Sequence, residues 1–295
     1  MRFPLRLPLA ALLLAIAPAA TPGGTAESRA PGGVLLRLRM RAPSLGGAER
    51  RVQVYLPPSY SAPDSSGRAY PVVYLLHGWP GSEGNWFGHG RAAATADSLI
   101  AQDSIPEVIL VAPNGRGQGF LGRSLYLDSQ DGSMRIADYI ARDLVEWTDR
   151  RFRTRTDAGH RGLIGLSDGA TAALALAFRH PEWFGACGGH SGEYRPKRGW
   201  TLGRVLGPEP GGSRLLAENS ALLVADTAAA RLGALSIYFD VGTSDRALED
   251  NRDLDRRLDS LGVAHTYREF AGGHAWSYWR AHLRESLVTV TARMR

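Results

Sequence analysis

From Val34 onward, the hydrophobic and polar positions follow two patterns that both predict strands. Val34–Met40 and Arg51–Leu56 alternate apolar and polar residues, as half-exposed strands do. They suit an antiparallel pair at the start of a sheet. We predict that Thr266–Arg268 is a short last strand. Four other runs are short and continuously apolar, as in buried parallel strands. These four runs are residues 70–76, 108–112, 162–166 and 235–239.

Segments with helical spacing lie between these strands. The longest covers residues 134–152 and places Ile136, Ile140 and Leu144 on one face. Because strands alternate with helices, we expect a mostly parallel sheet with helices on both faces. Residues 197–214 are rich in Gly and Pro, which predicts a loop that could belong to a cap. The other predicted helices are residues 92–101, 170–178, 247–261 and 278–294.

The first residues predict an export signal. Arg2 and Arg6 precede an apolar run, Leu7–Ala17, which is too short to span a bilayer comfortably. Small residues at Ala17 and Ala19 predict cleavage after Ala19. We therefore expect a signal peptide (1–19), a flexible leader (20–32) and one catalytic domain (33–295). The protein would be secreted or periplasmic, without stable membrane insertion after signal removal. A retained N-terminal anchor is the alternative.

Charge and cysteine content exclude several function classes. The chain has 35 Lys and Arg against 29 Asp and Glu among its 295 residues, a net charge of +6. The arginines are scattered, so nucleic-acid binding is not predicted. Cys187 is the only cysteine, which excludes an internal disulfide, and its small neighbours predict that it is buried. No histidine or cysteine spacing matches a metal motif, so we expect no metal site.

A nucleophile motif lies between a predicted strand and a predicted helix. Residues Gly165–Gly169 match G-x-S-x-G, and the strand-turn-helix context is what a nucleophile elbow requires. Such a turn lifts the hydroxyl of Ser167 above the sheet. It also aims the backbone N–H of Asp168 at a developing oxyanion.

The apolar run of residues 70–76 ends in His77-Gly78-Trp79-Pro80-Gly81. Hydrolases with a nucleophile elbow place their second oxyanion donor at this turn, which here is the backbone N–H of Trp79. We expect His77 to shape the loop through hydrogen bonds rather than to act in catalysis.

The candidate base and acid lie near the C-terminal end. His274 follows the last predicted strand, where the base sits in the chain order Ser, Asp, His. The acid should follow residues 235–239, where Asp240 and Asp245 are both available. We favour Asp245 because it lies on the loop beyond the strand, although it could also cap the next helix.

A second glycine motif does not support a cofactor. Residues Gly117–Gly122 match G-x-G-x-x-G after a strand, but residues 123–131 are predicted to be a loop rather than a helix. A dinucleotide-binding turn must open a helix. We therefore expect no nucleotide cofactor, and a glycine-rich wall of the cleft instead.

Together these motifs resemble the esterase family of α/β hydrolases that includes S-formylglutathione hydrolase (esterase D), feruloyl esterases, enterochelin esterases and secreted mycolyltransferases. The resemblance rests mainly on YPVVYLLHGWPGSEGNW, GLSDG, GTSD and GGHAWSYW. It implies an α/β-hydrolase fold, no cofactor, and Ser167, Asp245 and His274 as nucleophile, acid and base. The oxyanion donors would be the N–H groups of Trp79 and Asp168. The charge of Asp168, where relatives often carry an uncharged residue, could alter acyl specificity or rate.

The function predicted from these features is that of an exported serine esterase. It would cleave a small-molecule or glycan ester in two steps through an acyl-enzyme. Two alternatives remain: an extracellular acyltransferase with a sugar acceptor, and a non-catalytic binding protein on a hydrolase scaffold. Trp86, Tyr126 and Trp276 are candidate substrate contacts, and packing is an equally good account of them.

Overall fold

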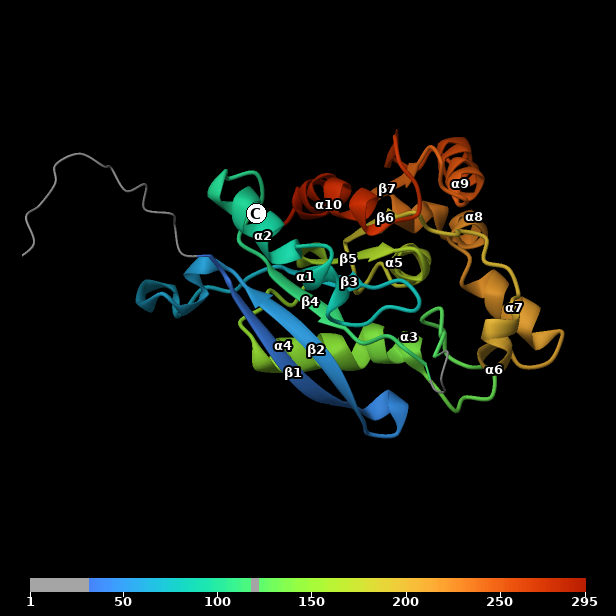
Figure 1. Ribbon diagram of the computed structural model, residues 1–295, viewed down its shortest axis with the longest axis horizontal. Helices are drawn as coiled ribbons and strands as arrows, with labels where there is room; N and C mark the ends of the chain where they lie inside the picture. The colour runs from blue at the N-terminus through green and yellow to red at the C-terminus, as the bar shows by residue number, and fades with distance from the viewer. Residues whose placement is uncertain (1–31, 118–121) are drawn as a thin grey trace, which may run out of the picture. The chain divides into compact units, whose positions relative to one another are not determined.

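The computed structural model describes residues 32–117 and 122–295. The predicted signal peptide, and all of the predicted leader except Gly32, lie outside the described residues. Within the described part, one sheet is flanked by helices on both faces (Figure 1). Its strands are β1 (Val34–Ala42), β2 (Ala48–Leu56), β3 (Val72–Leu76), β4 (Ile109–Pro113), β5 (Arg161–Leu166), β6 (Ala186–His190), β7 (Ser236–Gly242) and β8 (Thr266–Phe270).

The strand order is β1-β2-β4-β3-β5-β6-β7-β8. β1 pairs with β2 and β2 with β4 in antiparallel fashion, and every later pair is parallel. The predicted antiparallel opening and the predicted mostly parallel α/β sheet are therefore confirmed. The carboxyl ends of the parallel strands share one edge of the sheet, where ligands bind in open α/β folds.

Alternate residues of the central strands contribute to two hydrophobic cores. Tyr74 and Leu163 belong to the core beneath α5, whereas Leu75 and Ile164 belong to the core beneath α10. This alternation explains why the central strands are continuously apolar. The helices are α1 (Asn85–Gly88), α2 (Ala92–Ala101), α3 (Ile136–Asp138), α4 (Leu144–Arg151), α5 (Asp168–Arg179), α6 (Gly203–Leu206), α7 (Gly211–Glu218), α8 (Ala221–Leu232), α9 (Leu248–Ser260) and α10 (Trp276–Thr291).

Two segments differ from the sequence prediction. β6 was not predicted, because Ala186–His190 contains no β-branched residue and no Phe, Tyr or Trp. Its glycines are imposed by packing, since a Cβ on Gly189 would lie 2.3 Å from the Tyr194 hydroxyl oxygen. Residues 197–214 are not the predicted loop, because α6 and the start of α7 fall within them. The predicted helix of residues 134–152 is confirmed, with a π-helical turn over Tyr139–Asp143 that joins α3 to α4.

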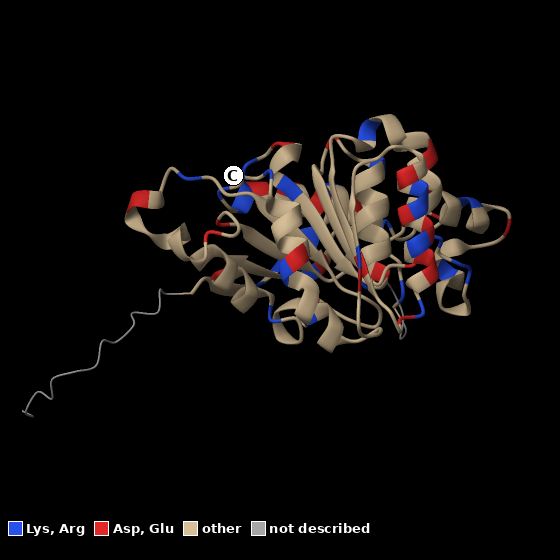
Figure 2. Ribbon diagram, turned by 90° about the horizontal axis from the view of Figure 1, so that it is seen from above, with Lys and Arg blue, Asp and Glu red and all other residues tan. Residues whose placement is uncertain are grey.

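Charged residues of both signs are interspersed over the helices, as Figure 2 shows. No helix among residues 32–117 and 122–295 combines the length and the apolar character needed to cross a bilayer.

Candidate active site

Ser167 lies at the sharp turn between β5 and α5, with φ 51° and ψ −123°. A non-glycine residue rarely adopts positive φ, so the turn holds Ser167 in a strained conformation. The flanking glycines are required by close backbone contacts. A Cβ on Gly165 would lie 2.0 Å from the Gly169 carbonyl oxygen, and one on Gly169 would lie 2.2 Å from that of Leu76. The G-x-S-x-G pattern thus has a steric cause here.

Ser167, His274 and Asp245 lie in one hydrogen-bonded line. His274 Nε2 is 2.9 Å from Ser167 Oγ, and His274 Nδ1 is 3.0 Å from both carboxylate oxygens of Asp245. An Nδ1–H that donates to the carboxylate leaves the Nε2 lone pair facing the serine hydroxyl. That is the arrangement a general base needs to activate a serine.

The surroundings of Asp245 favour its ionised form. Burial alone would raise the pKa of Asp245, but hydrogen bonds from His274 and from the Ala247 N–H hold it below its usual value. His274 is further fixed by the Trp279 ring, which lies edge-on with its centroid 5.0 Å away. The Trp279 indole N–H donates in turn to Ser191 Oγ at 3.0 Å.

Asp240, the other candidate acid, belongs to a separate buried network. It accepts hydrogen bonds from His190 Nδ1 at 2.9 Å, the Tyr238 hydroxyl at 2.7 Å and the Tyr278 hydroxyl at 3.0 Å. His190 Nε2 is 3.0 Å from Ser286 Oγ. The structure therefore places Asp245 rather than Asp240 against His274. No local pattern reveals this network, because His190 ends β6, whose residues carry no strand signal.

The loop after β3 passes directly beside the nucleophile. A Cβ on Gly78 would lie 3.0 Å from the Ser167 Cβ, so only glycine allows this approach. His77 organises the loop: its Nδ1 is 2.9 Å from the Gly78 carbonyl oxygen, and its Nε2 accepts from the Gly115 N–H at 3.0 Å. One ring nitrogen donates and the other accepts, so this geometry requires a neutral imidazole. The expected structural role of His77 is confirmed by these contacts.

His77 should make stability depend on pH between about pH 6.5 and 4. Burial lowers its pKa from 6.5 to about 4, so the folded chain keeps it neutral where the unfolded chain protonates it. The stabilisation is complete above pH 6.5 and is lost as the pH falls toward 4, by about 3 kcal/mol in all. Urea denaturation across this range should give a shallower pH slope for His77→Gln than for the unmodified chain. An unchanged slope would contradict this assignment.

Asp168, which adds a negative charge beside the turn, is neutralised by Arg123. Arg123 Nε and a terminal nitrogen each donate to an Asp168 carboxylate oxygen at 2.8 Å, a bidentate geometry. The hydrogen bond to Asp168 raises the pKa of Arg123. Arg123 also donates to Thr201 Oγ1 at 3.2 Å and lies over the Trp79 ring. This pair could not be predicted from a local pattern, because its members are 45 positions apart in the chain.

Ser167 and His274 open into a pocket of about 830 Å³. Trp79 and the candidate substrate contact Trp276 line this pocket. Its remaining lining residues are Arg51, Gly78, Pro80, Gly81, Ser82, Asn85, Arg116, Leu166, Arg246, Ala275 and Trp279.

The predicted substrate contacts of Trp86 and Tyr126 require correction. The Trp86 side chain is completely buried, and its indole N–H donates to the Leu76 carbonyl oxygen at 3.0 Å. Tyr126 is also buried, with its hydroxyl donating to the His77 carbonyl oxygen at 2.8 Å. Both side chains therefore pack behind the pocket, where they hold the loop after β3 from below.

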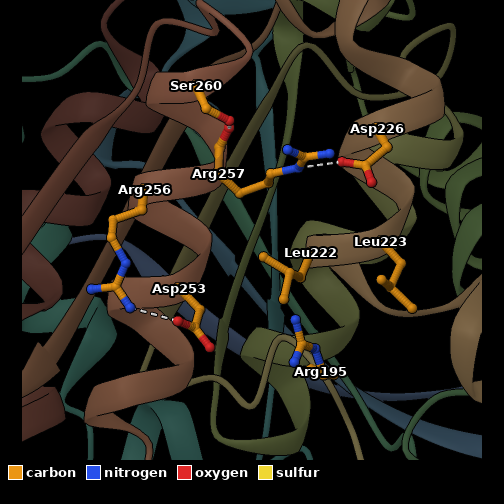
Figure 3. Close-up of a pocket in the computed structure, with 8 residues that line it drawn as sticks. All are labelled: Arg195, Leu222, Leu223, Asp226, Asp253, Arg256, Arg257 and Ser260. Atoms are coloured by element: carbon orange, nitrogen blue, oxygen red, sulfur yellow. Dashed lines mark hydrogen bonds and ion pairs between the residues drawn. The ribbon is translucent and has the colours of Figure 1, made fainter.

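A second hollow, of about 630 Å³, lies between α8 and α9 (Figure 3), and Ser167 is not among the residues that line it. Two of its arginines are already paired: Arg257 with Asp226 at 2.5 Å and Arg256 with Asp253 at 2.6 Å. It contains neither a nucleophile nor a base arranged for catalysis, so the pocket at Ser167 is the candidate active site.

Within residues 32–117 and 122–295, no group of three or more His, Cys, Asp or Glu side chains could hold a metal ion. The glycine motif at Gly117–Gly122 closes through a hydrogen bond from the Gly117 N–H to the Gly122 carbonyl oxygen at 2.8 Å, and residues 118–121 lie outside the described residues. Among the residues that the structure describes after this motif, the first helix begins at Ile136.

The sheet order and the serine at the β5–α5 turn define an α/β hydrolase. The chain belongs to the family described as "Putative esterase", whose model matches residues 43–290. The resemblance noted from the sequence motifs is thereby confirmed.

Three similar proteins illustrate the family. An esterase of Mycobacterium tuberculosis is 27% identical over 255 residues, which cover 76% of this chain and 52% of the relative. An endo-1,4-beta-xylanase/feruloyl esterase of Xylanibacter ruminicola is 31% identical over 153 residues, 51% of this chain and 21% of the relative. The solved structure of a ferulic acid esterase has a TM-score of 0.79 at 25% identity and covers 89% of this chain and 99% of that one. The chain spans only 57% of the length of an uncharacterized protein of Corynebacterium glutamicum that it matches and, as stated, 52% of that of the mycobacterial esterase.

Proposed function

We propose that this protein is an exported serine esterase that hydrolyses carboxylic esters through an acyl-enzyme. The observation that carries the proposal is the position of His274, whose two ring nitrogens contact Ser167 Oγ and the Asp245 carboxylate at 2.9 and 3.0 Å. Membership of the esterase family supports the same reaction class. Export rests on the apolar N-terminal run of residues 7–17 alone.

In the proposed reaction, Ser167 Oγ attacks the ester carbonyl carbon while His274 Nε2 accepts the hydroxyl proton. The carbonyl oxygen becomes an oxyanion, which the backbone N–H groups of Trp79 and Asp168 stabilise. His274 then gives its proton to the leaving alcohol, and the acyl group stays on Ser167. A water molecule, deprotonated by His274, releases the acid and restores the serine.

The substrate is proposed to be a small-molecule or glycan ester. Two of the similar proteins are named as feruloyl or ferulic acid esterases, and the pocket of about 830 Å³ is large enough for an aromatic acyl group or a sugar ring. Trp79 and Trp276 line this pocket and present aromatic surfaces to either group.

Covalent labelling tests the proposed function directly. 4-Nitrophenyl acetate should be hydrolysed, and a fluorophosphonate should block the reaction with one label per chain, located by mass spectrometry on Ser167. Both results follow from a serine whose hydroxyl faces His274 at 2.9 Å. Hydrolysis that survives full labelling of Ser167, or a folded protein that neither cleaves the ester nor takes up the label, would refute the proposal.

A further inference from the structure

The pocket at Ser167 is lined by three arginines, Arg51, Arg116 and Arg246. Among the described residues that line it, none is an aspartate or a glutamate. A cleft with charges of one sign concentrates ligands of the opposite sign, because its low-dielectric walls focus the field. Simple ester chemistry needs none of these cations, so their presence requires a separate explanation.

The carboxylates of the catalytic group do not offset this positive charge. Asp168 is held by the bidentate contact with Arg123, which is not a lining residue, and the Asp245 side chain is buried behind His274. The Asp168 carboxylate therefore faces Arg123 and the Asp245 carboxylate faces His274, so neither faces the pocket.

Arg51 has one acidic partner and remains accessible. Its Nε lies 3.0 Å from Glu83 Oε1, and Asn114 donates to the other Glu83 oxygen at 2.7 Å. The Arg51 side chain is nevertheless 61% exposed, whereas that of Glu83 is only 10% exposed. A ligand in the pocket would therefore meet the guanidinium before the carboxylate.

Arg246 lies beside the catalytic histidine. Its Nε is 3.5 Å from Glu193 Oε1, a loose contact, and its side chain is 65% exposed. One of its terminal nitrogens lies 3.4 Å from His274 Nε2. The leaving alcohol must receive its proton from this Nε2. Arg246 therefore stands beside the alcohol part of a bound ester.

We propose that the pocket selects esters whose alcohol part carries an anionic group, a carboxylate or a phosphate, and that Arg246 binds this group. The proposal deepens, and rests on, the proposed esterase function. Guanidinium groups form charge-assisted, bidentate contacts with both kinds of anion. Arg51, which stays 61% exposed beside Glu83, lines the same pocket.

The test compares esters that differ only in charge. 4-Acetoxybenzoate and its neutral analogue 4-acetoxybenzamide both release a phenol. The kcat/KM of the anionic ester is divided by that of the neutral ester. This quotient is then divided by the same quotient of the hydroxide-catalysed rates, which removes the difference in intrinsic reactivity. This normalised ratio should be about tenfold in favour of the anion at low ionic strength, and should fall as salt is added. 4-Acetoxyphenyl phosphate, compared with 4-methoxyphenyl acetate, shows whether a phosphate is preferred to a carboxylate.

Arg246→Gln should lower the normalised ratio about threefold to fivefold, as expected for the loss of a solvent-exposed ion pair. The matched control is Arg256→Gln, which removes an equally exposed arginine from the hollow between α8 and α9. The control should leave the ratio unchanged.

The outcomes separate the two proposals. If the unmodified protein hydrolyses both esters with a normalised ratio near one, the anionic preference is overturned while the esterase function stands. A preference that Arg246→Gln and Arg256→Gln reduce equally also overturns it. A preference seen only for a carboxylate in the acyl part, as in mono(4-nitrophenyl) succinate, overturns the assignment to the alcohol side. A folded protein that cleaves neither ester overturns the anionic preference, and it refutes the esterase function as well if it also fails to cleave 4-nitrophenyl acetate and to take up the fluorophosphonate.

Discussion

Replacing Ser167 with alanine should lower kcat/KM for 4-nitrophenyl acetate by about 10⁴-fold or more. The substitution removes the oxygen that lies 2.9 Å from His274 Nε2, and with it the covalent route. Activity that remains would come from oxyanion stabilisation and substrate positioning alone. Initial rates at several substrate concentrations, corrected for spontaneous hydrolysis, measure the effect.

Ser98→Ala is the matched control for this experiment, because Ser98 is an exposed serine on α2. It should retain full activity, which excludes a general effect of serine removal. A Ser167→Ala protein that retains more than about a tenth of the activity would mean that another group attacks the ester. Thermal melting of all three proteins should show that each is folded.

Asp245→Asn and Asp240→Asn should have opposite consequences, although both replace an acid near the end of β7. Asp245→Asn should lower kcat about 10⁴-fold with little change in stability, because an amide can no longer hold the tautomer of His274 that faces Ser167. Steady-state kinetics measure this effect.

Asp240→Asn should instead reduce the free energy of unfolding by about 2–4 kcal/mol. The new amide N–H₂ group would face donors, because His190, Tyr238 and Tyr278 all point hydrogens at this side chain. Urea denaturation measures the loss, and kcat per folded molecule should stay within about tenfold of the original value. If Asp240→Asn abolished catalysis while Asp245→Asn remained active, the acid would have been assigned to the wrong residue.

The parts of the fold that the sequence predicted are those with a local pattern. Val34–Met40 alternates, residues 70–76 are continuously apolar, and residues 247–261 repeat leucines at helical spacing. Each pattern depends on near neighbours in the chain. β6 has no such pattern, because the close packing of α5 and α10 against it selects glycine and alanine instead of branched residues.

The site residues also divide into those that a local motif predicts and those whose positions depend on the fold. Ser167 and His274 could be proposed from motif and chain order, and the position of Asp245 on the loop after β7 distinguished it from Asp240. Arg123 and Arg246 could not be assigned, because their positions depend on contacts between distant segments. Trp86 was misjudged for a related reason: aromatic residues near a motif can face the substrate or the core, and only the fold decides which.

Because Cys187 is buried, the rate at which its thiol reacts can report how often the sheet opens. Its thiol, the only one in the sequence, lies in the middle of the sheet with no exposed surface, and burial raises its pKa far above the usual range. A disulfide reagent such as Ellman's reagent can reach it only when the sheet comes apart. Where reclosing is faster than the chemical step, the rate of thiol modification reports the free energy of that opening. Variants of this protein can therefore be ranked by stability in the absence of denaturant, with the native thiol as the reporter group.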